Sequence, residues 1–68
     1  MSKENAYIGE LNRALTRARG ELTHYQAAET NASDPAVIKW YRIEAGSTLM
    51  QITRLEMSLE DYTASLTQ

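Results

Sequence analysis

The chain has 68 residues and a formal net charge of −2, with one histidine and no cysteine. These counts exclude disulfides and thiolate zinc sites, and one histidine cannot alone build an imidazole-rich metal site, so we expect no metal and no cofactor. A domain of this length buries only about 60% of the surface of its unfolded chain. Because so small a core needs outside support, we expect a homodimer.

Charge and hydropathy narrow the classes of partner. No apolar run approaches the roughly 18 residues of a membrane span, and residues 1–5 lack the charge and apolar core of a signal peptide. We therefore expect a cytoplasmic protein with no membrane partner. The acidic balance argues against nucleic acid, whose binding needs basic excess. The charge is polarised, since residues 11–20 hold three arginines and no acid, whereas residues 55–68 hold three acids and no lysine or arginine.

A first helix is predicted over residues 3–30. Ser2 can cap it, Glu4 is favourable in its first turn, and Asn31 tolerates the left-handed conformation common at a helix exit. Its apolar residues recur in alternating steps of three and four, the spacing of a coiled-coil seam. They are Ile8, Leu11, Leu15, Ala18, Leu22 and Tyr25.

A turn at residues 31–34 separates this helix from a second one, predicted over 35–66. Asp34 can cap the second helix with its carboxylate, and Pro35 suits the first helical position, where no backbone N–H is needed. The same alternating spacing continues along this helix. It runs through Ile38, Tyr41, Ala45, Thr48, Ile52, Leu55, Leu59, Tyr62 and Leu66.

The short turn makes the two helices antiparallel. Folding the chain there pairs seam residues whose numbers sum to 66 or 67, such as Leu15 with Ile52. The prediction is one all-α domain over residues 1–68, a coiled-coil hairpin that dimerises into a four-helix bundle, with Tyr7, Ala14, Val37 and Leu49 widening its apolar stripe. The expected core and dimer residues are Ile8, Leu11, Leu15, Leu22, Leu49, Ile52, Leu55 and Leu59.

A second apolar series, Trp40, Ile43, Met50 and Met57, follows the far side of the second helix. It is either the dimer interface or a binding surface for a different protein, because Trp and Met are enriched at interface cores. On the first helix, Arg13 and Arg17 lie one turn apart. They either belong to a solvated face, with Arg17 pairing with Glu21, or bind a carboxylate-rich partner or a phosphate.

No catalytic pattern is present. Glu56, Glu60 and Asp61 are expected to form a solvated acidic tip, and His24 has no triad-like nucleophile nearby. The sequence contains no glycine-rich phosphate loop, and a two-helix hairpin offers no deep cleft. We therefore expect a non-enzymatic inhibitor or adaptor that masks a surface of a larger protein. The alternatives are an RNA-binding hairpin dimer, with Arg13, Arg17 and Arg19 on phosphates, and a purely structural bundle component.

The short acidic chain, its two helices, its lack of cysteine and its arginine and tyrosine surface resemble the phage-encoded anti-activators of quorum sensing, over the whole chain. The resemblance implies a dimeric helical hairpin in the host bacterial cytoplasm. Its implied targets are a LuxR-type transcriptional regulator, whose DNA binding it would block, and the ATPase that drives type IV pilus assembly. The corresponding partner-binding residues are the arginine strip around Arg17 and the pair Trp40–Tyr41, and our own analysis adds Arg13, Ile43 and Met50.

Overall fold

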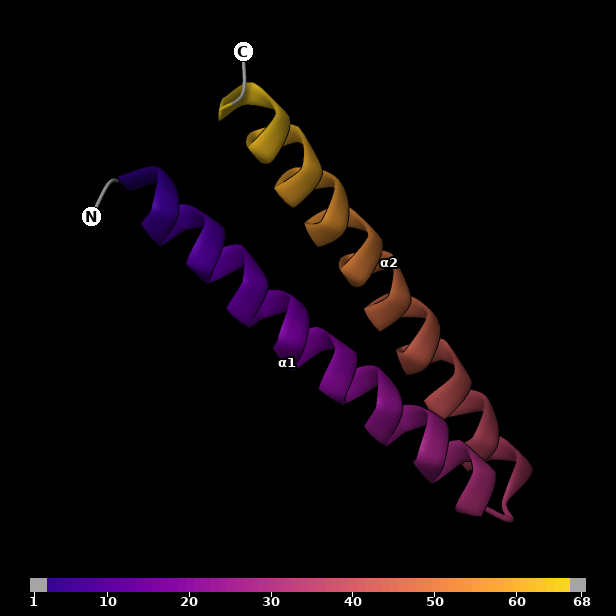
Figure 1. The fold of residues 1–68 in the computed structure, drawn as a ribbon. Coiled ribbons are helices and arrows are strands. Elements are labelled where there is room, and N and C mark those ends of the chain that lie inside the picture. The colour runs from indigo at the N-terminus through magenta and orange to yellow at the C-terminus, as the bar shows by residue number, and fades with distance from the viewer. Residues whose placement is uncertain (1–2, 67–68) are drawn as a thin grey trace.

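A computed structural model describes residues 3–66 of the chain, with side chains from residue 6 onward. Helix α1 spans Lys3–Asn31, helix α2 spans Pro35–Leu66, and the described residues contain no strand. Figure 1 shows the two helices running antiparallel, with both chain ends at the pole opposite the turn. The predicted all-α, antiparallel two-helix hairpin is confirmed. The predicted cap Ser2 and the predicted first-turn residue Glu4 lie outside the residues whose side chains the structure describes.

The turn is fixed by the N-terminal cap of α2. The Ala36 amide donates to the Asp34 Oδ1 at 2.9 Å, and the Ile38 amide donates to the Asp34 carbonyl oxygen at 2.9 Å. The first bond satisfies an amide that has no partner within the first helical turn, and the second is the first regular backbone bond of α2. Pro35 is the first residue of α2, as its fixed φ and missing N–H favour. The predicted capping role of Asp34 is confirmed.

The end of α1 differs from the prediction. No described residue has a positive φ, so Asn31 does not adopt the left-handed conformation. Instead the Ala32 amide donates to the Ala28 carbonyl at 3.0 Å and to the Glu29 carbonyl at 3.3 Å. The helix therefore ends with ordinary backbone angles, and the chain reverses through the residues between Asn31 and Pro35.

The core is the predicted seam between the helices. Five described side chains are buried, namely Leu11, Leu15, Ala18, Thr48 and Ile52. Leu22, Leu55 and Leu59 are half-buried and pack against Leu15, Ala18 and Ile52. Ile8 is half-buried as well. The core is therefore one row of side chains between two helices, consistent with the thin core expected for this length.

The seam ends before Leu66. This residue belongs to the apolar series, but 45% of its surface is exposed. The pairing rule would place its partner before the start of α1 at Lys3, so α1 offers nothing for Leu66 to pack against. The open pole is closed one turn earlier, where the Tyr7 and Tyr62 rings meet edge to face with centroids 4.6 Å apart.

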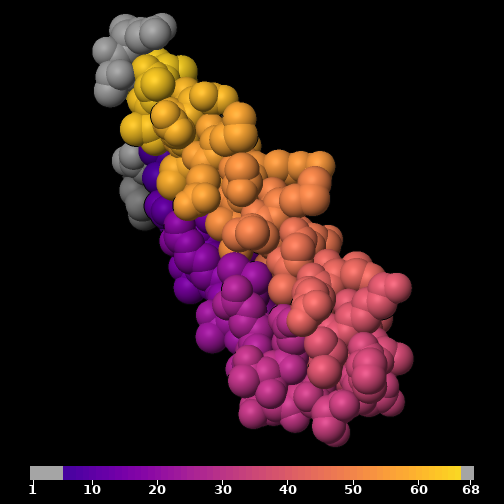
Figure 2. Space-filling model, turned by 90° about the vertical axis from the view of Figure 1, so that its right-hand side faces the viewer, coloured from indigo at the N-terminus to yellow at the C-terminus, as the bar shows by residue number. Residues whose placement is uncertain are grey.

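Ion pairs link the two helices at two levels. The Arg19 guanidinium donates to Glu56 at 3.1 Å, and the Arg42 Nε donates to Glu29 at 2.6 Å. The molecule is a narrow slab of 51 × 19 × 12 Å, and the space-filling view in Figure 2 shows its long outline. No helix in the described part of the chain is long and apolar enough to cross a membrane.

Candidate functional site

The exposed apolar surface lies almost wholly on α2. Among the described residues, every exposed large apolar side chain except Tyr7 comes from this helix. The set on α2 comprises Val37, Trp40, Ile43, Leu49, Met50, Met57 and Leu66. Contiguous exposed apolar side chains are the usual sign of a protein interface. Helix α2 is therefore the element to examine for binding.

Four rings form a cluster beside the turn, which we call the turn-end aromatic patch: His24, Tyr25, Trp40 and Tyr41. Tyr25 is at its centre, with ring centroids 5.7 Å from His24, 6.2 Å from Trp40 and 6.3 Å from Tyr41. The Trp40 and Tyr41 rings are 5.1 Å apart at 67°. Tyr25 and Tyr41 are half-buried, whereas His24 and Trp40 are exposed. The patch thus exposes the rings of His24 and Trp40 next to two half-buried tyrosine rings.

The seam explains why these rings meet. Tyr25 and Tyr41 form a seam pair near the turn, because their numbers sum to 66. Only Ile38 among the seam residues lies closer to the turn. His24 and Trp40 each precede one of these tyrosines by one residue, which turns their side chains by about 100° around their own helices. Two antiparallel helices place both on one side, so the central Tyr25 contacts both rings.

The two arginines of the strip, Arg13 and Arg17, differ in whether they form an ion pair. Arg13 forms an ion pair with Glu10 one turn earlier. Arg17 forms no ion pair with any described side chain, and the predicted pair with Glu21 is wrong. An arginine that precedes its glutamate by four residues has the less favourable orientation, and both side chains are exposed to water. Arg17 is thus exposed and unpaired.

Arg17 lies on the same face of α1 as the aromatic patch. It precedes His24 by seven residues, which is about two helical turns. An unpaired guanidinium therefore lies on the α1 face that continues into the aromatic patch. Among the predicted partner-binding residues, this surface brings Arg17, Trp40 and Tyr41 to one side of the hairpin. Arg13 lies one turn farther from the patch on the same face of α1 but is paired with Glu10. Ile43 and Met50 are exposed on another side of α2.

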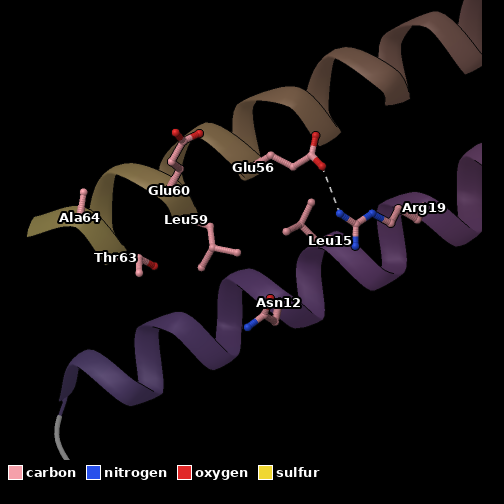
Figure 3. A pocket seen from close by; sticks show the side chains of 8 residues that line it. All are labelled: Asn12, Leu15, Arg19, Glu56, Leu59, Glu60, Thr63 and Ala64. Atoms are coloured by element: carbon pink, nitrogen blue, oxygen red, sulfur yellow. Dashed lines mark hydrogen bonds and ion pairs between the residues drawn. The ribbon is translucent and has the colours of Figure 1, made fainter. Parts of the chain in front are cut away.

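A groove of about 510 Å³ lies between the helices toward the open pole. In Figure 3, Leu15 and Leu59 point toward each other from the two helices, and Arg19 reaches Glu56 across the edge. The groove is also lined by Asn12, Glu60, Thr63 and Ala64. Arg19 and Glu56 at its edge are already paired with each other within the hairpin.

Sequence reasoning missed two members of this surface. The sequence predicts Tyr25 in the seam, and neither Tyr25 nor His24 is among the predicted partner-binding residues. The pairing rule could have identified them. Once the chain is folded at the turn, residue 24 comes level with residue 42 and residue 25 with residue 41. The rule does not account for the pair of Arg19 with Glu56, whose numbers sum to 75; these long side chains reach toward each other along the seam.

Comparison with known proteins identifies no relative. No family model, no curated protein and no solved structure matches the chain significantly.

Proposed function

We propose that the chain is a small protein-binding inhibitor or adaptor that holds its target on the turn-end aromatic patch, with Arg17 as a second anchor. The observation that supports this most directly is Trp40, which is packed edge to face on Tyr25 yet 52% exposed. Because Tyr25 already restricts the Trp40 ring on one side and the other side is exposed, the ring loses little conformational freedom on binding. Trp, Tyr and Arg are the residue types that dominate interface hot spots.

The mechanism is occupancy. The target would bury the outer face of Trp40 against an apolar surface, while Arg17 would donate to a carboxylate outside that contact. The target would lose access to its own partner or substrate. No chemical step is required, so the proposal includes no catalytic residue and no cofactor.

The first targets to test are those that the sequence resemblance implies. They are a LuxR-type transcriptional regulator, whose DNA binding the protein would block, and the type IV pilus assembly ATPase. Both would be met in the cytoplasm of a host bacterium. The RNA-binding alternative gains no support from the geometry, because Arg13 and Arg19 pair with glutamates and only Arg17 of the three is unpaired. The structural-component alternative would not require an exposed Trp40.

The test compares purified wild-type protein with Trp40→Ala and Arg17→Ala against each purified target, with the Kd measured by calorimetry. Trp40→Ala should weaken binding by about 30-fold or more, the range of an aromatic hot spot. Arg17→Ala should weaken it by about tenfold, and its loss should shrink at high salt. Arg54→Ala is the matched control, at an exposed residue outside the patch, and it should bind like wild type.

A capture from bacterial lysate with tagged wild type and the same variants extends the test to other targets. A protein lost with Trp40→Ala and kept with Arg54→Ala supports the proposal. Equal recovery with both variants contradicts the assignment of the patch. Recovery of RNA in place of protein favours the alternative.

A further inference from the structure

Helix α2 carries a second heptad series on the side away from the seam, and its last member, Glu60, also borders the groove between the helices. Its members follow steps of four and three, as the seam residues do, and every one of them is exposed. The series, which we call the outer stripe, is Lys39, Ile43, Gly46, Met50, Thr53, Met57 and Glu60. Ile43 is 59% exposed and Met50 is 60% exposed. A helix that packed only within its hairpin would be polar on this side.

Gly46 has no reason to be glycine within the hairpin. A Cβ added there would meet nothing within 4 Å, and its φ is that of an ordinary helix. Glycine costs a helix interior about 1 kcal/mol relative to alanine. The open space above Gly46 lies between Ile43 and Met50 on the outer stripe, where a packed neighbour would use it.

The surface area of the hairpin points to a missing interface. The accessible surface is 5254 Å² for a chain of 7.7 kDa. A folded monomer of this mass exposes about 4,300 Å² by the usual scaling. The excess of about 900 Å² is close to the roughly 800 Å² that each partner buries in a stable interface.

We propose that the outer stripe packs antiparallel against the outer stripe of a second copy, with Met50 on the twofold axis. As in the seam between α1 and α2, the residue numbers of facing pairs alternate between two consecutive sums. In the proposed interface these sums are 100 and 99. Ile43 then packs on Met57 of the second copy, Gly46 faces Thr53 of the second copy, and Met50 faces its own equivalent. Lys39 and Glu60 close the interface at each end as an intermolecular ion pair.

Charge selects both the partner and its direction. Within the described chain, Lys39 and Glu60 form no ion pair. Parallel packing would place lysine on lysine and glutamate on glutamate, which is unfavourable. Antiparallel packing of a second copy pairs opposite charges at both ends. An unrelated partner would need the same apolar spacing and the reverse charge order, whereas a second copy has both by symmetry.

The arrangement is a row of four helices with the two α2 helices at its centre. This differs from the closed four-helix bundle that the sequence predicts, in which residues beside the seam would face the partner. It leaves the turn-end aromatic patch outside the central layers, since Trp40 is not on the outer stripe. The inference does not depend on the proposed function, because dimerisation is measured on the purified chain alone.

The first experiment is sedimentation equilibrium of the full chain. Wild type should be a dimer. Met50→Glu should raise the dissociation constant by about 100-fold or more, because two carboxylates would meet on the axis. Lys39→Glu and Glu60→Lys should each raise it about tenfold, and the double variant should return it to the wild-type value. Leu66→Glu is the control for an added charge outside the stripe. Circular dichroism should show unchanged helicity throughout, since every substituted residue is exposed.

Disulfide trapping locates the axis. The chain has no cysteine, so Met50→Cys should oxidise to a covalent dimer, whereas Met57→Cys, which faces Ile43 of the second copy, should not. A monomeric wild type at all concentrations overturns the proposal and leaves the stripe to a different protein. A dimer that survives Met50→Glu, or charge reversals that are not rescued in the double variant, overturns it in favour of another dimer face.

Discussion

At the scale of single residues, the hairpin depends on a few side chains, because one seam supplies its whole core. Leu15 is 2% exposed and packs with Ala18 and Ile52. In a larger protein a neighbouring layer would share the loss of such a residue. Here the described residues form no second layer, so each buried seam residue contributes a large part of the stability.

Leu15→Ala should therefore lower the free energy of unfolding by about 2–5 kcal/mol, through lost apolar contact and the cavity left behind. Urea unfolding followed by circular dichroism at one fixed protein concentration measures the change. Leu66→Ala is the matched control, since that leucine is exposed, and it should change the stability by less than about 0.5 kcal/mol. Equal losses in the two variants would contradict the assigned seam.

The residue scale is also where sequence reasoning was weakest. The partners of exposed charged side chains could not be predicted: Arg17 and Glu21 have the right spacing but do not pair, while Arg19 pairs with Glu56 of the other helix. An exposed ion pair stabilises the fold by less than about 1 kcal/mol relative to the two hydrated side chains, so local spacing alone does not determine which pairs form. The burial of the seam involves larger energies, and the spacing of apolar residues predicted it.

At the scale of elements, the two helices and their break were predictable because several signals agree. The heptad spacing, the Asp34 cap and Pro35 all place the start of α2 at one residue, and the helix begins there. The end of α1 was less predictable. Asn31 permits a left-handed exit, but the cap of α2 completes the reversal without one.

Asp34→Ala should lower the free energy of unfolding by about 1 kcal/mol, because the Ala36 amide loses its acceptor. Asp34→Asn should retain most of the stability, since asparagine is an equally good cap. Ser33→Ala, a change at the adjacent exposed position, is the control and should be neutral. A neutral Asp34→Ala would mean that Pro35 and the seam define the turn without the cap. The measurement is again urea unfolding at fixed concentration.

At the scale of the whole molecule, the sequence predicted the hairpin but could not specify which face a partner covers. Two surfaces of α2 are apolar enough, and spacing alone treats them alike. The structure separates them: Trp40 is packed onto Tyr25 beside the turn, while Ile43 and Met50 are largely exposed on the outer stripe. The proposed target surface and the proposed dimer surface follow from that difference.

A dimeric native state has a thermodynamic consequence for the whole molecule. The unfolding midpoint of the wild type should rise by several degrees for each tenfold increase in total protein concentration, because association stabilises only the folded chains. Calorimetric scans over two decades of concentration measure this dependence. The Met50→Glu variant should show a midpoint that does not depend on concentration. A constant midpoint for wild type would show that each hairpin folds alone.

The antiparallel hairpin places both chain ends at the pole opposite the turn (Figure 1). In the proposed pair, the outer stripes run in opposite directions about Met50, so Leu66 comes level with Asp34 of the second copy. Each pole of the dimer then carries the chain ends of one copy and the aromatic patch of the other. A bulky domain fused to either terminus would shield the patch of the neighbouring copy rather than its own, whereas a short peptide tag would leave both patches accessible.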